Sequence, residues 1–100
     1  MDEYRIKISD LAKKDIRDTE KYIREELLNP IAAENTANAL LDGIATLETM
    51  PHRVAVVRDE RLAKMGIRGL SIKNYTAFFC INEESKIVDI VRVLYSRRDW

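Results

Sequence analysis

The chain opens with an alternating segment that leads into a stretch of helical periodicity. Residues 4–8 alternate along the chain, which predicts a short β-strand. Ser9 or Asp10 is suited to cap a following helix. In that helix, small and apolar residues recur at spacings of three and four and predict one narrow buried stripe, formed by Ala12, Ile16, Thr19, Ile23 and Leu27.

A second amphipathic stretch runs from Asn29-Pro30 to Met50-Pro51. Asn29 is suited to cap this helix and Pro30 to occupy its first position. Small residues on its apolar face allow close packing, so we expect the two helices to form an antiparallel hairpin. The apolar positions that mark this helix are Ala33, Ala37, Leu40, Leu41, Ile44 and Leu47.

The second half of the chain has the pattern of a strand meander. Residues 52–66 read as an irregular basic connection, in which residues 54–57 suit a short extended piece. Strands are predicted over residues 67–72, 75–81 and 87–95. The first two are joined by the turn Lys73-Asn74, where Asn74 would tolerate a positive φ. Strict alternation along the last strand would place Asp89 and Arg92 on opposite faces.

The predicted order of elements is β-α-α-β-β-β. Helices grouped before a meander favour an α+β fold in which the helical hairpin packs on one face of a small antiparallel sheet. The last strand is apolar at nearly every position, so we expect it to be central in the sheet. One hundred residues suit a single domain over residues 1–100.

Composition and charge narrow the classes of function. Apolar residues make up 46% of the chain and charged residues 34%, which is typical of a globular protein. No apolar run reaches the roughly 18 residues of a membrane span, and the first residues lack a signal-peptide pattern, so a cytoplasmic location is expected. Residues 1–50 carry 7 Lys/Arg and 11 Asp/Glu, whereas residues 51–100 carry 10 and 6. Anion binding is therefore expected in the C-terminal half.

The chain contains one cysteine and one histidine, so we expect neither an internal disulfide nor a metal site, and no cofactor is implied. Cys80 is interpreted as a buried strand residue and His52 as a surface turn residue. By contrast, Arg97 and Arg98 stand side by side directly after the last strand. Their permanent charges repel unless an anion or a carboxylate lies between them. Asp99 can neutralise one, which leaves the other for a phosphate or an acidic partner segment.

Two motifs in the meander are specific. They are Tyr75-Thr76-Ala77-Phe78-Phe79 and Ile90-Val91-Arg92-Val93-Leu94-Tyr95-Ser96-Arg97-Arg98-Asp99. In these motifs, and in its order of elements over the whole chain, the protein resembles the RelE/ParE superfamily of toxins from bacterial type II toxin–antitoxin systems, which includes plasmid stabilisation proteins. The resemblance implies a partner antitoxin that wraps the toxin as an extended chain and covers its groove.

For the RelE-like branch, the resemblance implies a metal-independent endoribonuclease that cuts mRNA on the ribosome. Attack of a 2′-hydroxyl on the adjacent phosphate needs positive charge near the developing phosphorane. Arg97 and Arg98 would supply this charge, and Arg68 would bind or polarise the scissile phosphate. Residues expected to bind RNA or another target are Arg61, Lys64, Arg92, Tyr95 and Trp100, the two aromatic rings by stacking on a base. Alternatively, Arg92 pairs with an acid on a neighbouring strand.

Two other interpretations stay open beside mRNA cleavage. ParE-like members of the superfamily poison DNA gyrase without nuclease activity, and a degenerate toxin would only bind its antitoxin. Nuclease members often carry arginine where this chain has Thr76, and many carry a tyrosine where it has Trp100. A neutral net charge also suits a ribosomal RNA binder poorly. The intact Arg97-Arg98 pair and Arg68 favour the nuclease, which is therefore our first hypothesis.

Overall fold

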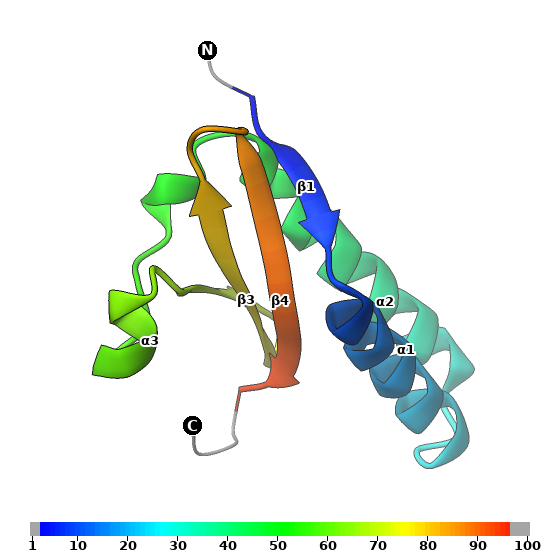
Figure 1. Cartoon of the computed structure of the whole chain (residues 1–100). Coiled ribbons are helices and arrows are strands. Elements are labelled where there is room, and N and C mark those ends of the chain that lie inside the picture. The colour runs from blue at the N-terminus through cyan, green and yellow to red at the C-terminus, as the bar shows by residue number, and fades with distance from the viewer. Residues whose placement is uncertain (1–2, 97–100) are drawn as a thin grey trace.

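The computed structural model describes residues 3–96 and confirms an α+β fold. Helices α1 and α2 lie side by side and cover one side of a four-stranded sheet, while the short helix α3 stands on the other side of β3 (Figure 1). The elements are β1 (Arg5–Ile8), α1 (Asp10–Glu25), α2 (Pro30–Ala45), the 3₁₀ turns η1 (Thr46–Glu48) and η2 (Pro51–Arg53), α3 (Glu60–Lys64), β2 (Arg68–Ile72), β3 (Tyr75–Asn82) and β4 (Ile87–Tyr95).

The strand order in the sheet is β1-β4-β3-β2, so β4 is central, as its apolar composition predicted. The β2–β3 and β3–β4 pairs are antiparallel. However, β1 runs parallel to β4, with Arg5 opposite Ile87 and Ile8 opposite Ile90. The sheet is therefore mixed rather than purely antiparallel, because the first and last strands of the chain meet side by side and point in the same direction.

The two main helices begin where their capping residues predicted. The Ser9 hydroxyl accepts a hydrogen bond from the Ala12 N–H at 3.0 Å, and the Asn29 side chain accepts one from the Ala32 N–H at 3.0 Å. Each bond satisfies one of the free N–H groups of a first helical turn. The predicted stripe of α1 is buried at Ala12, Ile16 and Ile23, but Leu27 is 57% exposed because the helix ends at Glu25.

The core lies between the two helices and the sheet. Its largest fully buried side chains are Leu40, Ile44, Leu47, Phe79, Val88, Ile90 and Val93. Helix α2 approaches β2 closely at Gly43, where a Cβ atom would lie 2.7 Å from the Cδ1 atom of Ile72. A side chain at this position would force Ile72 to move, so a glycine is needed for the close contact of α2 with the sheet.

A β-bulge interrupts the alternation of β4. Phe78 faces Arg92 and Phe79 faces Ile90, so Val91 is the extra residue on β4. Cys80 faces Asp89, and Phe78 and Cys80 share one face of β3. Asp89 and Arg92 therefore lie on the same face. The prediction of opposite faces was wrong because it assumed an unbroken period of two.

The connections differ from the sequence prediction in their details. In the β2–β3 turn it is Lys73, rather than Asn74, that has a positive φ, of 54°. The predicted irregular connection contains η2 and α3, and Val56 forms a bridge to Arg68 at the outer edge of β2. The short extended piece predicted around Val56 is thus present as one bridge.

Candidate functional site

The face of the sheet turned away from α1 and α2, called the open face here, carries the predicted motifs. By strand register it presents Thr76, Phe78 and Cys80 on β3, facing Leu94, Arg92 and Asp89 on β4. Near its end the Thr76 hydroxyl and the Ser96 hydroxyl are 2.8 Å apart. This contact and the Ser96 N–H donating to the Asn74 carbonyl hold the chain directly before Arg97. Arg97, Arg98 and Trp100 themselves lie outside the described residues.

The Arg92 guanidinium is bound by a carboxylate from α1. Its Nε donates to Asp15 Oδ2 at 2.8 Å and its Nη2 to Asp15 Oδ1 at 3.0 Å, a bidentate arrangement. The Asp15 hydrogen bonds raise the pKa of Arg92, so its charge is permanent. The alternative from the sequence was that Arg92 pairs with an acid on a neighbouring strand. Arg92 does pair with an acid, but this acid is Asp15 on helix α1. The Arg92 side chain is still 40% exposed, so it remains partly at the surface despite this ion pair.

Arg68 lies on the other face of the sheet. It faces Phe79, which is completely buried in the helix-covered core. Its Nη1 donates to the Val54 carbonyl at 2.5 Å and to the His52 carbonyl at 3.4 Å. Arg68 therefore holds the segment around η2 and is not brought together with Arg92.

The other predicted binding residues are dispersed. Tyr95 faces Tyr75 on the helix-covered side, where the two rings meet edge to face with centroids 5.5 Å apart. Desolvation, followed by the neighbouring Tyr95 and Tyr22 hydroxyls, raises the pKa of Tyr75. Arg61 and Lys64 are exposed on α3, which stands apart from α1 and α2 (Figure 1). These two cations present charge to the surface beside β3 and β2.

A polar cluster that the sequence did not predict lies where η2, β1 and the β3–β4 loop meet. Its centre is the Glu83 carboxylate, which accepts hydrogen bonds from the Tyr4 hydroxyl at 3.1 Å and from Lys86 at 3.2 Å. His52 Nε2 lies 2.5 Å from the same carboxylate. Desolvation would raise the pKa of Glu83, but the contacts with Lys86, Tyr4 and His52 outweigh it and the pKa is lowered. Both oxygens of the Glu83 carboxylate have partners from this cluster. Glu83 therefore joins the three segments and is not placed as a general base.

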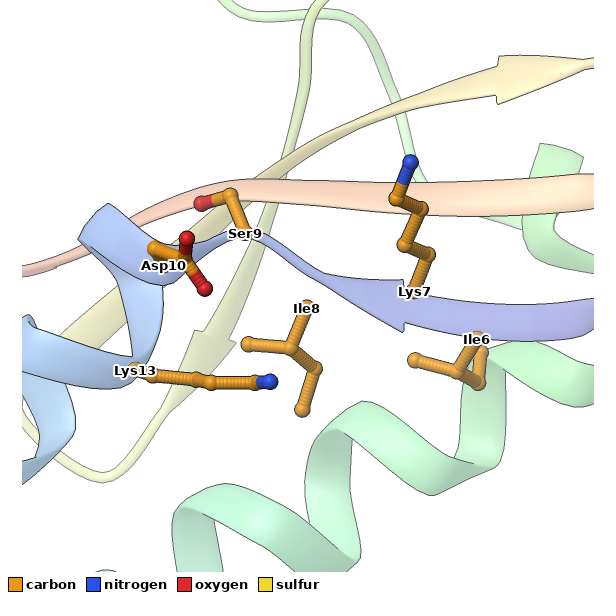
Figure 2. Close-up of a pocket in the computed structure, with 6 residues that line it drawn as sticks. All are labelled: Ile6, Lys7, Ile8, Ser9, Asp10 and Lys13. Atoms are coloured by element: carbon orange, nitrogen blue, oxygen red, sulfur yellow. The ribbon is translucent and has the colours of Figure 1, made fainter.

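Two shallow hollows follow β1, the first strand of the chain. Figure 2 shows one of them, with Ile6 and Ile8 directed toward α2, and Lys7 directed away from it. Lys13 and Asp10 from α1 complete this hollow, and the other lies around Arg5 at the start of the strand. Their linings mix apolar and oppositely charged side chains.

Two further features, a metal site and a membrane-spanning helix, are absent from the residues that the structure describes. Among residues 3–96, no three His, Cys, Asp or Glu side chains gather as metal ligands would. None of the helices in this range combines the length and the apolar composition of a membrane span. Cys80 is partly buried, and desolvation followed by the nearby Asp89 carboxylate raises its pKa. Its thiol is therefore protonated at neutral pH and is a poor nucleophile.

Solved structures with the same fold are toxin–antitoxin complexes. A structure described as the chromosomal ParDE system from P. aeruginosa superposes with a TM-score of 0.77 and 18% identity, over 95% of this chain and 98% of that one. The RelBE2 complex from Mycobacterium tuberculosis gives a TM-score of 0.68 and 21% identity, over 93% and 98%. The archaeal RelE–RelB complex from Pyrococcus horikoshii gives 0.54 and 18%, over 99% and 100%. At these identities the likeness shows the fold.

A comparison of the sequence with family profiles identifies the family of this chain. The profile described as the ParE toxin of the type II toxin–antitoxin system parDE matches residues 6–100, which is nearly the whole chain. No curated protein sequence matches the chain significantly. The predicted resemblance to the RelE/ParE superfamily is confirmed, and the chain belongs to the ParE family of toxins from type II toxin–antitoxin systems.

Proposed function

We propose that this toxin arrests growth by binding DNA gyrase, without cutting RNA, and that it acts in the cytoplasm. The observation that carries the proposal is the position of Arg68, the one predicted catalytic residue within the described part of the chain, which lies away from the open face that carries Arg92 and Ser96. One guanidinium is bound by main-chain carbonyls on the helix-covered side and the other by Asp15 at the edge of the open face. A nuclease of the predicted kind needs its cations gathered around one phosphate. Membership of the ParE family also supports DNA gyrase as the target.

Ribosome-dependent mRNA cleavage is the second candidate, and one observation favours it. The Thr76–Ser96 contact fixes the end of β4 on the open face, and Arg97 and Arg98 follow Ser96 directly. The partly exposed Arg92 lies on the same face. In this second candidate function, Arg92 would bind phosphate. Arg97 and Arg98 would supply positive charge near the phosphorane, as predicted from the sequence. A degenerate toxin that only binds its partner is the third candidate.

For either activity we propose an antitoxin as the partner. The solved structures of this fold contain a toxin with its antitoxin. The C-terminal half of this chain carries 10 Lys/Arg against 6 Asp/Glu, which suits an acidic segment of the antitoxin. Such a segment would cover the open face and mask the cations that follow Ser96.

The two activities are distinguished by assaying both targets with the same protein. Purified toxin is added to DNA gyrase in a supercoiling assay, and mRNA from induced cells is mapped by primer extension. The proposal predicts inhibition of supercoiling and intact message. Message cut in register with codons, together with unaffected gyrase, would establish the nuclease instead. Normal growth after induction would leave the binding-module interpretation.

A further inference from the structure

The turn between α1 and α2 exposes a cluster of large apolar side chains. This cluster, called the hairpin tip here, lies at the end of the helical hairpin away from the N-terminal end of the chain (Figure 1). Its members and their exposed fractions are Tyr22 56%, Leu27 57%, Leu28 82% and Ile31 73%. Single exposed apolar residues are ordinary on a protein surface, but four within a stretch of ten residues make this end of the hairpin a candidate interaction surface.

Leu28 adopts a backbone conformation that leucine disfavours. Its φ is 51°, in the left-handed region where Cβ crowds the following carbonyl and where glycine or asparagine usually stands. The next residue, Asn29, continues the turn by donating its N–H to the Ile23 carbonyl at 3.1 Å. The Leu28 side chain is the most exposed of the large apolar ones, so it contributes little to the core. A positive φ alone does not distinguish Leu28, because Met50 shares it. Leu28 differs in lying beside other exposed apolar residues at the same turn.

The charge around the hairpin tip indicates what it binds. Residues 20–34 carry four acids, at positions 20, 25, 26 and 34, against Lys21 and Arg24. An apolar surface with an acidic surround repels nucleic acid and attracts a protein surface rich in Lys and Arg. It also disfavours contact between the tips of two copies of this chain, since like charges would meet.

We propose that the hairpin tip is the surface by which the toxin docks on its protein target, in an apolar pocket of the target with a basic rim. This inference rests on the proposed function, because it assumes that growth arrest results from binding to a protein. It separates the target contact, on the acidic helical hairpin, from the open face proposed for the antitoxin. Leu28 would be the anchor of the contact because it is the most exposed of the four residues.

A matched pair of variants tests the proposal. Leu28→Gly removes the exposed side chain and relieves the left-handed backbone, so the protein folds with an unchanged or raised Tm. Met50→Gly is the control, because Met50 also has a positive φ, of 48°, and a 68% exposed apolar side chain, but lies before η2. Leu27→Ser serves as a second tip variant. Each is assayed for Tm, for growth arrest after induction, and for inhibition of DNA gyrase supercoiling.

The expected result is a loss of potency by roughly tenfold or more for Leu28→Gly and Leu27→Ser in both activity assays, with Met50→Gly like wild type. Unchanged potency of both tip variants would overturn this inference and leave the gyrase proposal intact. Loss of growth arrest in the tip variants, with a wild-type toxin that never inhibits gyrase, would overturn the gyrase proposal and keep the tip as the contact to another target. Dimers of the wild-type chain that dissociate on Leu28→Gly would assign the tip to self-association and also overturn the inference.

Discussion

Asp15 on α1 and Arg92 on β4, 77 residues apart, form the contact that ties the helical hairpin to the central strand. The same carboxylate also accepts a hydrogen bond from the Val93 N–H at 2.9 Å. Strand β1 pairs with β4 only as far as Ile90, so beyond this point the edge of β4 would be open. Two side chains bind backbone groups there. The Ser9 hydroxyl donates to the Val91 carbonyl at 3.1 Å, and the Asp15 carboxylate accepts from the Val93 N–H. Helix α1 thereby protects an edge that would otherwise invite another strand.

Asp15→Asn should lower the free energy of unfolding by about 2 kcal/mol, because an amide cannot accept all three hydrogen bonds from Arg92 and Val93. Urea denaturation at neutral pH measures the change. Asp18→Asn is the control on the same helix, since Asp18 forms an exposed pair with Lys14 and its loss should have little effect. An equal effect of the two substitutions would mean that the Asp15 contacts contribute nothing beyond surface charge.

Arg68→Met should destabilise the protein by about 1–2 kcal/mol, because the carbonyls of Val54 and His52 lose their donor. Arg61→Met, on the exposed surface of α3, should leave unfolding almost unchanged. Unfolding curves and growth assays are recorded for both variants. If Arg68→Met unfolds like wild type but no longer arrests growth, Arg68 acts on the target, as the nuclease hypothesis predicted.

Stability should fall in acid partly through Glu83. The contacts with Lys86, Tyr4 and His52 hold the pKa of this carboxylate below its ordinary value of 4.5, so the unfolded chain takes up the proton first as the pH is lowered. The stabilisation is present above pH 4.5 and is lost as the pH falls through the lower folded-state pKa. In Glu83→Gln the decrease of Tm between neutral pH and this range should be smaller than in wild type. Glu84→Gln, on the same loop, should behave like wild type, and identical profiles for all three proteins would refute the prediction.

Cys80 should react slowly with a thiol reagent at neutral pH. Partial burial and the Asp89 carboxylate raise its pKa, so little thiolate is present in the folded protein. The rate should be well below that of the urea-unfolded chain and should rise with pH. Asp89→Asn removes one of the two causes and should increase the folded-state rate. Equal rates in the folded and unfolded states would show that the thiol is freely accessible.

The open face illustrates the limit of sequence reasoning about the candidate site. The motifs correctly indicated the family, and the apolar composition of the last strand correctly indicated its central place in the sheet. They did not indicate that Arg68 and Arg92 lie on opposite faces, since this depends on the register of β2 and on the bulge at Val91. A bulge has no signature in a run of apolar residues, all of which suit a buried strand equally well. The roles of Arg97, Arg98 and Trp100 stay predictions.

Local signals along the chain determined where the two main helices start and most of the residues that those helices bury. The Ser9 and Asn29 caps and the spacing of the buried residues act over three or four positions, so they can be read without knowledge of the fold. Only the tertiary structure decided the parallel pairing of β1 with β4, the contact of Asp15 with Arg92 and the cluster around Glu83. The Asp15–Arg92 and Tyr4–Glu83 contacts join residues that are 77 and 79 positions apart, and such partners are selected by the packing of the whole domain rather than by any neighbouring residue.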